Sequence, residues 1–168
     1  MSATEQPGVA ILKADIIAQA KAAGFDDVGF SPADLSEETQ TDFQEWLDRG
    51  AHGDMAWMEE TRERRASPTA LWSEVKSVIV LAMNYGPDGD PLETLRHPDK
   101  ANISVYARNR DYHDLVKKRL KRVARWLVDE TGCELKVFVD TAPILEKPVA
   151  AGSSLGWQGK HTNLVSSE

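Results

Sequence analysis

The amino-acid sequence predicts an α/β (α+β) fold, with helices flanking a single mixed sheet. The chain has 168 residues, which is a typical length for one domain. Its content of 41% hydrophobic and 28% charged residues is typical of a globular protein. Segments with helical periodicity alternate along the chain with short apolar runs of strand length. Because the sequence has no internal repeat, low-complexity tract or long linker, we expect residues 1–168 to form one domain.

The first half of the chain is expected to contain three helical segments and two strands. In order, these are a helix from about Val9 to Ala23, a strand at Asp27–Ser31, helices at Glu37–Arg49 and Asp54–Arg65, and a strand at Ser77–Asn84. Gly24 follows the first helix as a candidate C-cap. The last strand is an apolar run typical of a sheet interior. Residues 85–102 hold three Pro and two Gly, which indicates a surface loop.

An amphipathic helix is expected from Tyr112 to about Glu130, closed by Gly132. At 100° per residue its apolar side chains fall within a sector of roughly 60°. These are Val116, Leu120, Val123 and Leu127, and the opposite side carries Lys117, Lys118, Lys121, Arg122 and Arg125. A net charge of −7 argues against bulk nucleic-acid binding, yet residues 106–126 hold eight Lys and Arg against two Asp. The basic face is therefore either a solvated surface or one that meets phosphates.

Asp140 is the candidate catalytic residue that the residues alone single out. A strand is expected at Lys136–Val139, followed by a helix at Ile144–Ala151 with Thr141 as its N-cap. Ligand sites in α/β sheets lie outside the carboxyl ends of strands. Burial among apolar neighbours would raise the pKa of this carboxyl and suit a general acid. The alternative, equally open, is that Asp140 shares the capping of the helix with Thr141.

Two further clusters are candidate ligand sites. Residues 152–159 contain three glycines, which favours close backbone approach, and Lys160 and His161 follow them. Such a loop suits a large cofactor, although a hydrogen-bonded histidine is the commoner role of His161. Residues 106–113 interleave aromatic and basic side chains, which suits stacking on a planar ligand or on nucleotides. Asp111 in this cluster is more often a helix acid facing the dipole.

The remaining features exclude several classes of protein. Cys133 is the single cysteine, so the chain cannot form an internal disulfide, a zinc site or an iron–sulfur cluster by itself. No His/Cys cluster indicates a metal bound directly by protein. The longest apolar run, Val78 to Met83, is too short to span a bilayer. The N-terminus has no secretory pattern, so a cytoplasmic location without membrane contact is expected.

Taken together, three segments resemble the epoxyqueuosine reductase family. They are RRASPTALWSEVKSVIVLAMNYG (64–86), YARNRDYH (106–113) and VFVDTAPILEKPVAAGSSLGWQGKHTNLVS (137–166). The resemblance covers roughly Ala20 to the C-terminus. It implies the last step of queuosine biosynthesis, the removal of the epoxide oxygen of epoxyqueuosine in tRNA with cobalamin and iron–sulfur clusters. It also implies a cobalamin-binding domain that is similar to the reductive dehalogenases and nitroreductases.

The resemblance assigns roles to individual residues. The aspartate of the family's VDT motif is the proton donor and falls on Asp140. In the family's chemistry a reduced cobalt centre attacks the epoxide, and the resulting alkoxide takes a proton from this acid. Asp140 is also expected beside the corrin, together with Arg65, Tyr106, Arg108, Lys160, His161, Thr162 and Leu164. Lys117, Lys118, Lys121, Arg122 and Arg125 become candidates for contact with the tRNA backbone.

This sequence departs from the family pattern in two places. Family members continue into a ferredoxin-like region whose CxxCxxCxxxCP motifs bind two 4Fe–4S clusters, whereas Cys133 stands alone here. The chain is therefore expected to be the N-terminal portion, inactive by itself, with a C-terminal iron–sulfur domain or an external reductant as partner. Asn109 stands where glycine is expected and tolerates the left-handed conformation. The alternatives are a non-catalytic corrinoid- or tRNA-binding module and a flavin-binding nitroreductase-like domain.

Overall fold

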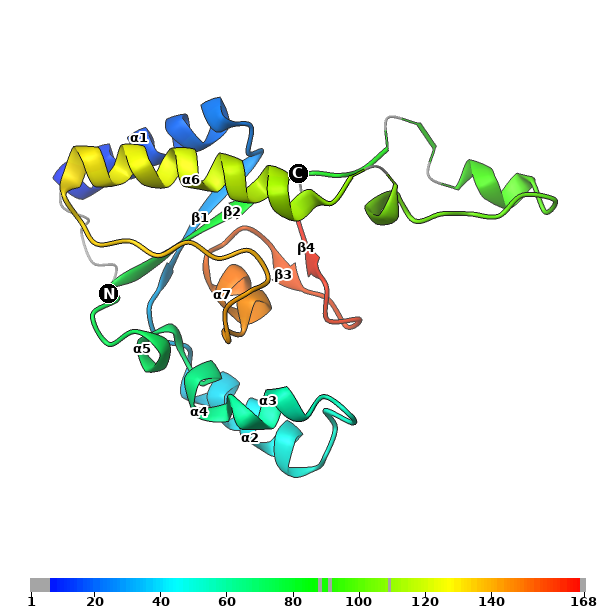
Figure 1. Cartoon of the computed structure of the whole chain (residues 1–168), viewed down its shortest axis with the longest axis horizontal. Coiled ribbons are helices and arrows are strands. Elements are labelled where there is room, and N and C mark those ends of the chain that lie inside the picture. The colour runs from blue at the N-terminus through cyan, green and yellow to red at the C-terminus, as the bar shows by residue number, and fades with distance from the viewer. Residues whose placement is uncertain (1–6, 88, 91, 109, 167–168) are drawn as a thin grey trace. The chain divides into compact units, whose positions relative to one another are not determined.

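The computed structural model describes residues 7–87, 89–90, 92–108 and 110–166, with side chains from residue 12 onward (Figure 1). Asn109, where glycine was expected, lies outside the described residues. The chain divides into two compact units. The first unit comprises Met1–Asp26 and Met83–Val137, and the second comprises Asp27–Ala82 and Phe138–Glu168.

Two long helices that lie side by side form the first unit (Figure 1). They are α1 (Pro7–Ala23) and α6 (Tyr112–Thr131). Two short 3-10 turns, η1 (Glu93–Arg96) and η2 (Val105–Ala107), interrupt the segment that leads to α6. Small and aliphatic side chains of the two helices are buried, and they are Ile16, Ala20, Ala23, Val123 and Leu127. Burial of this apolar face stabilises the pair, because each helix alone would leave its face in water.

The ends of α6 and the loop after α1 are fixed by specific hydrogen bonds. The Asp111 carboxylate caps α6 by accepting from the His113 backbone N–H at 2.9 Å. Gly132 ends the helix at φ +67°, and its N–H donates to the Val128 carbonyl at 2.8 Å. Arg119 of α6 donates a hydrogen bond from Nη1 to the Gly24 carbonyl at 2.5 Å. The guanidinium thus ties α6 to the loop after α1.

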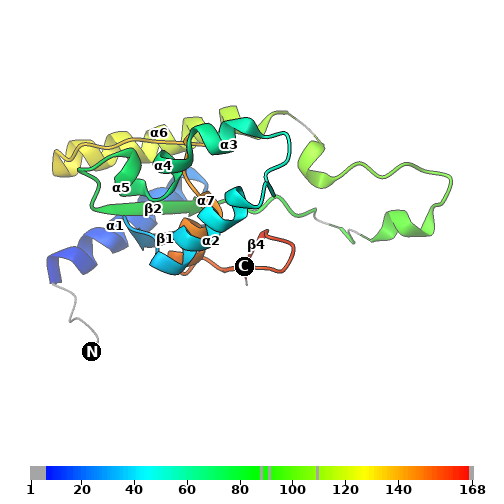
Figure 2. The ribbon, with the colours of Figure 1, turned by 90° about the horizontal axis from the view of Figure 1, so that it is seen from below.

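A two-stranded antiparallel sheet forms the centre of the second unit. It pairs β1 (Asp27–Pro32) with β2 (Ser77–Ala82), so that Asp27 lies opposite Ala82 and Pro32 opposite Ser77. The helix α7 (Glu146–Gly152) packs against both strands (Figure 2). Gly29 allows this close approach, because a Cβ there would lie 2.4 Å from Ser153 Oγ. The sheet therefore supports the residues that follow α7 as well as the helix itself.

Short helices and a small hairpin complete the second unit. Between β1 and β2 the chain forms α2 (Glu37–Asp48), α3 (Ala56–Glu60), α4 (Arg62–Arg65) and α5 (Pro68–Leu71). Arg62 pairs with Asp48 at 2.6 Å and links α4 to α2. After α7, β3 (Trp157–Gln158) and β4 (Leu164–Val165) form an antiparallel hairpin.

Several sequence predictions are confirmed and others are wrong. The helix before Gly24, both strands before residue 85, the helix after Ser36, the amphipathic basic helix and the strand at Leu164 are all present. The charged stretch from Asp54 is helical but breaks at Thr61 into α3 and α4. In place of one mixed sheet, the described residues form two separate antiparallel pairs. The run at Ser77 is therefore half-buried in a two-stranded sheet, not in a sheet interior.

The expected strand at Lys136–Val139 is wrong, and so is the start of the helix that follows it. Residues 132–138 have no regular structure, and Phe138 is 39% exposed. A strand needs a partner edge, which the apolar run itself does not encode. The helix begins at Glu146, and its N-cap residue, Leu145, makes no side-chain capping bond. Thr141, the expected cap, is exposed and lies before the helix.

Candidate active site

Asp140 lies in an open loop between α6 and α7. Its backbone has φ +53°, in the left-handed region that aspartate adopts more readily than most residues. Its side chain is exposed, so the expected burial among apolar neighbours is wrong. The physical reason is the missing strand: without it, Val137 to Val139 do not enclose the carboxyl. Asp140 thus faces outward, where a ligand can reach it.

Glu146, the first residue of α7, interacts with Asp140, and a hydrogen bond to the Asp140 side chain is one cause of the shift in the Glu146 pKa. The pKa of Glu146 is raised to about 7, first by desolvation of the carboxyl and then by the hydrogen bond and repulsion from the Asp140 carboxylate. Glu146 is exposed as a whole residue, so the desolvation concerns the carboxyl group and not its stem. Near neutral pH, a fraction of the Glu146 carboxyl groups therefore keeps its proton.

Arg65 completes this group from the end of α4. Its positive charge acts on Glu146 and opposes the rise of that pKa. Its Nε donates to Thr61 Oγ1 at 2.7 Å, and its guanidinium carbon lies 4.8 Å from the centre of the Trp57 ring. Desolvation lowers the pKa of Arg65, while attraction from Glu146 raises it. Arg65 and Asp140, to which the resemblance assigned roles at the site, therefore both influence the pKa of the Glu146 carboxyl.

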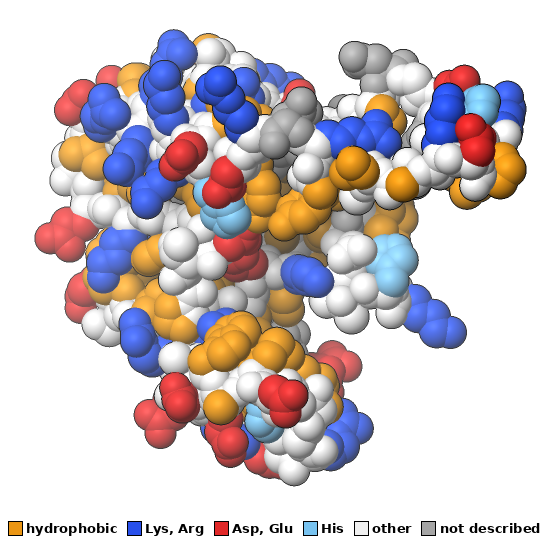
Figure 3. Space-filling model, turned by 45° about the vertical axis from the view of Figure 1, so that its right-hand side comes forward, with side chains coloured by type: hydrophobic (Ala, Val, Ile, Leu, Met, Phe, Trp, Pro, Cys, Tyr) orange, Lys and Arg blue, Asp and Glu red, His pale blue; other side chains and the backbone are white. Residues whose placement is uncertain are grey.

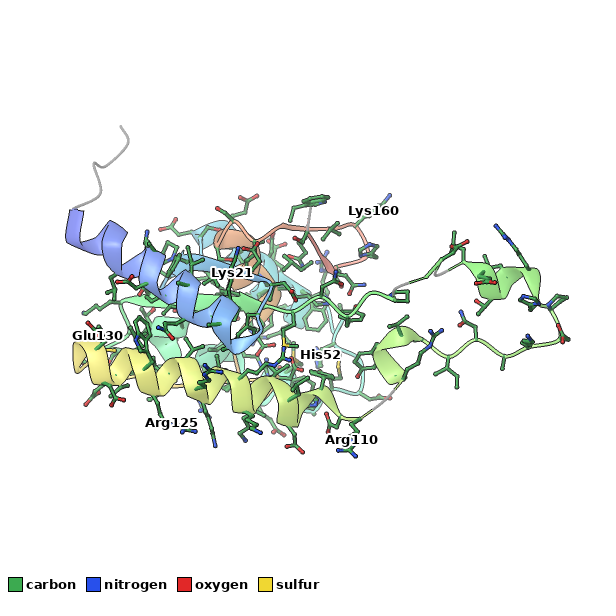
Figure 4. The ribbon with its side chains drawn as sticks, turned by 90° about the horizontal axis from the view of Figure 1, so that it is seen from above. Lys21, His52, Arg110, Arg125, Glu130 and Lys160 are labelled. Carbon is green, nitrogen blue, oxygen red and sulfur yellow. The ribbon has the colours of Figure 1, made fainter. Side chains whose placement is uncertain are left out.

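The β3–β4 hairpin carries the other expected ligand residues of this unit. Its turn is closed by the Thr162 N–H, which donates to the Gly159 carbonyl at 2.8 Å. The Asn163 N–H donates to His161 Nδ1 at 3.2 Å, so this ring nitrogen is an acceptor. The polar side chains Lys160, His161 and Thr162 are exposed, and Leu164 is half-buried. Lys160 projects from the end of the hairpin (Figure 4).

The glycines before this turn do allow close backbone approach, but the approach is within the chain. A Cβ at Gly156 would lie 2.1 Å from the Val165 carbonyl oxygen, and one at Gly159 would lie 2.8 Å from the His161 ring. These glycines therefore shape the hairpin itself. The polar side chains of the turn are exposed, and binding of a cofactor by this loop stays a prediction.

Tyr106 and Arg108 belong to the first unit. Tyr106 is 63% exposed, and its ring lies 5.8 Å from that of Tyr112 at a tilt of 55°. Arg108 Nε donates to the Ile103 carbonyl at 2.9 Å, which folds the segment back on itself. His113 stacks on Tyr112 at 4.2 Å and lies 2.7 Å from the Asp111 carboxylate. Hydrogen bonds to His113 lower the pKa of Asp111, which supports its predicted structural role at the start of the helix.

The basic side of α6 is exposed as expected. Its members, Lys117, Lys118, Lys121, Arg122 and Arg125, are all exposed and form the basic face of α6. Arg125 projects from the side of α6 that faces away from α1 (Figure 4), and blue side chains gather along this helix in Figure 3. Beside this face lies an open cavity of about 250 Å³. It is lined by Lys121, Ala124, Arg125, Val128 and Asp129 of α6 and by Leu135 and Val137.

Sequence reasoning missed Glu146. An acidic residue in the first turn of a helix is usually explained by its favourable interaction with the helix dipole. For that reason Glu146 was not considered as a residue of the site. The signal that could have found it is the pair of acids six residues apart, on either side of the predicted helix start. Within the described residues, no three His, Cys, Asp or Glu side chains gather closely enough to hold a metal ion. No described helix is long and apolar enough to cross a membrane.

Comparison with known proteins identifies several relatives. Residues 65–141 match the family model described as epoxyqueuosine reductase QueG, DUF1730. The epoxyqueuosine reductase of Vibrio cholerae is 42% identical over 147 residues, which cover 86% of this chain and 40% of that protein. The structure of the Streptococcus thermophilus epoxyqueuosine reductase matches with a TM-score of 0.73 and 26% identity, over 94% of this chain and 42% of that one.

A further solved structure shares the fold. It is an epoxyqueuosine reductase with an epoxyqueuosine-modified tRNA-Tyr stem loop, with a TM-score of 0.74 and 23% identity over 94% of this chain and 42% of that one. At this identity the likeness concerns the fold. The chain thus spans about 40% of the length of the relatives that it matches.

Proposed function

Because this chain is a partial homologue of the epoxyqueuosine reductases, we propose that it takes part in the reduction of epoxyqueuosine to queuosine in tRNA, with Asp140 as general acid. The observation that carries this proposal is the exposed side chain of Asp140, the aspartate of the VDT motif, in the loop before α7. Opening an epoxide leaves an alkoxide, which needs a proton from a positioned acid. The exposed position of Asp140 allows a bulky substrate to reach it.

The family resemblance also implies cobalamin, and the residues of the second unit fit such a ligand in chemical kind. A corrinoid presents an apolar ring plane and a polar periphery. The second unit exposes the apolar rings of Phe138 and Trp157, at 39% and 57%, together with polar side chains of the β3–β4 turn. When bound, cobalamin supplies the reducing chemistry for opening the epoxide. The cavity of about 250 Å³ beside α6 is too small for this group and is not its site.

We assign the expected ligand residues to binding and orientation. Lys160, His161 and Thr162 offer donors and acceptors at the hairpin turn, Leu164 offers apolar contact, and Arg65 offers a cation beside the carboxyl pair. Tyr106 and Arg108, which belong to the first unit, are proposed as cofactor-binding residues from the family resemblance alone. The single cysteine, Cys133, cannot hold an iron–sulfur cluster by itself. We therefore propose that the electrons are supplied by a cluster whose ligands lie outside these 168 residues or by an external reductant.

The basic face of α6 is proposed to contact the tRNA backbone. Five exposed cations on one helix face form an electrostatic surface that attracts phosphates, even on a chain with net charge −7. A structural neighbour was solved with an epoxyqueuosine-modified tRNA stem loop, which supports tRNA as the macromolecular substrate. The cytoplasmic location that tRNA modification requires is part of the same proposal.

An anaerobic absorbance titration of the protein with cob(II)alamin tests the cofactor part of the proposal. We expect a saturable shift to a base-off spectrum, and we expect the Asp140→Asn variant to give the same shift, because Asp140 acts on the substrate. The matched titration uses FMN. Binding of FMN without binding of cobalamin would contradict the proposal and favour a flavin-binding domain.

A further inference from the structure

We infer that the open cavity beside the basic face of α6 binds one unpaired nucleobase, and that Asp129 selects a base with an amino group. We name this cavity the α6 groove; five residues of α6 between Lys121 and Asp129 line it, together with Leu135 and Val137. All of these residues belong to the first unit. The inference rests on the proposed function, in which the basic face of α6 contacts the tRNA backbone.

The second wall of the α6 groove is the chain that follows the helix. Gly132 ends α6 at φ +67°, and its N–H donates to the Val128 carbonyl at 2.8 Å. The next residues return along the helix (Figure 1), so that Leu135 and Val137 line the same cavity as Val128. A helix and a returning segment thus form the two sides of a slot.

The interior of the α6 groove suits a small ring. Its apolar members are Ala124, Val128, Leu135 and Val137, and Val128 is 40% exposed. Its volume of about 250 Å³ is below the roughly 300–1,000 Å³ of pockets that enclose a drug-sized ligand. A single planar base fits this size, and covering the apolar side chains favours its binding.

Two cations connect the α6 groove to the basic face. Lys121 and Arg125 line the groove, are exposed, and lie four residues apart on the same side of the helix. In a nucleotide the base and the phosphate are joined through one sugar. A base in the groove therefore brings its phosphate close to these cations, and the Arg125 guanidinium can also stack on the base. This combination of charge and apolar surface fits a nucleotide.

Asp129 is the one acidic residue among those that line the α6 groove. Its position four residues after Arg125 would suit an ion pair within the helix. Asp129 nevertheless takes part in none of the ion pairs of the described residues. A carboxylate only accepts hydrogen bonds, so it favours the amino group of cytosine, adenine or guanine over uracil, which has none.

The competing explanation is a solvated helix surface on which Asp129 binds no ligand. Asp129→Asn tests the acid, and Asp114→Asn is its control, because Asp114 is exposed on α6 outside the groove. Ala124→Leu fills the groove without a change in charge. Its control is Ala18→Leu, at an exposed position of α1.

Fluorescence anisotropy with two labelled RNA oligonucleotides of equal length, oligocytidine and oligouridine, tests the selection by Asp129. Both carry the same phosphates, and their bases differ in an amino group against a carbonyl. We expect the wild type to bind oligocytidine about fivefold more tightly, as for one hydrogen bond to a charged group. In Asp129→Asn the two Kd values should agree within about twofold, since an amide also donates to the uracil carbonyl. Asp114→Asn should keep the wild-type preference.

The same measurement at several salt concentrations tests the groove. In Ala124→Leu we expect weaker binding of both oligonucleotides and no preference, with an unchanged slope of log K against log salt, because the phosphate contacts remain. Ala18→Leu should match the wild type.

The outcomes separate this inference from the function on which it rests. Salt-dependent binding without a preference for oligocytidine, or a preference that persists in Asp129→Asn and Ala124→Leu, would overturn the inference and leave the proposed tRNA contact in place. If the wild type shows no salt-dependent binding of either oligonucleotide, both the inference and the proposed tRNA contact of α6 fail.

Discussion

The ammonium group of Lys147 donates a hydrogen bond to the hydroxyl of Thr162 at 3.3 Å. The residue before Lys147, Glu146, interacts with Asp140, which contributes to the rise of the Glu146 pKa. The first turn of α7 is therefore attached to the turn of the β3–β4 hairpin, which carries residues that we propose for ligand binding.

Removal of this hydrogen bond is expected to weaken ligand binding. In Lys147→Met the hairpin turn loses its attachment to α7, so the Kd for cob(II)alamin should rise by about three- to tenfold, as expected for one hydrogen bond of about 1 kcal/mol. The absorbance titration gives the Kd. Lys76→Met, at an exposed position, is the control. An unchanged Kd in Lys147→Met would show that the turn does not bind the corrinoid.

Glu146 also makes the stability of the protein depend on pH. Its pKa rises from an ordinary 4.5 to about 7 on folding, so its contribution to stability is fully present below about pH 4.5 and is lost as pH rises through 7. Glu146→Gln removes this dependence. Since the residue is exposed and solvent screens it, the difference between the variants should change by about 1 kcal/mol over this range.

Urea unfolding of the wild type and of Glu146→Gln at pH 4.5, 6 and 8 measures this difference. The wild type should lose stability relative to the variant as pH rises. A constant difference across the three pH values would mean that Glu146 titrates alike in the folded and unfolded chains.

The contact between β1 and the residues after α7 depends on the absence of a side chain at position 29. In Gly29→Ala the new Cβ would lie 2.6 Å from the Ser153 carbonyl oxygen and 2.8 Å from Leu155 Cγ, so backbone must move. We expect a loss of about 1–3 kcal/mol in the free energy of unfolding. Gly89→Ala is the control, because a Cβ at that position would meet no atom within 4 Å. Equal stability of the two variants in urea would contradict this packing.

The basic face of α6 should determine the salt dependence of tRNA binding. Replacing Lys121, Arg122 and Arg125 by Gln is expected to lower the slope of log K against log salt by about 2 for an epoxyqueuosine stem loop. The control triple variant replaces the exposed Lys21, Lys76 and Lys100, with the same change in net charge. Fluorescence anisotropy at several salt concentrations measures both. An equal loss in both triple variants would point to net charge alone.

The helices and strands that were predicted correctly are those whose sequence pattern lies entirely within the element itself. Helix α6 has both an apolar side that includes Val123 and Leu127 and a glycine at its end, and each signal is local. β1 and β2 are likewise short runs bounded by breaks in the pattern. The residues of the basic face could be named in advance, since helical periodicity alone decides which side chains lie together.

The parts that were missed depend on partners far along the chain. Val137 to Val139 have the composition of a strand, but no strand of the described residues pairs with them. Without that strand, Asp140 is exposed and the helix start shifts to Glu146, so the role of the first-turn acid could not be deduced. Asp140 was singled out by its place after this apolar run and by the VDT motif, and its catalytic role stays a prediction.

Proton donation by Asp140 during epoxide reduction is the step on which the proposed function depends. The most direct measurement is single-turnover conversion of epoxyqueuosine to queuosine in a tRNA stem loop, followed by mass spectrometry, with cobalamin and a strong chemical reductant in the longer protein. We expect Asp140→Asn to slow conversion by at least about 100-fold while the Kd for the stem loop stays unchanged. Conversion by Asp140→Asn within threefold of the wild-type rate would contradict this role of Asp140.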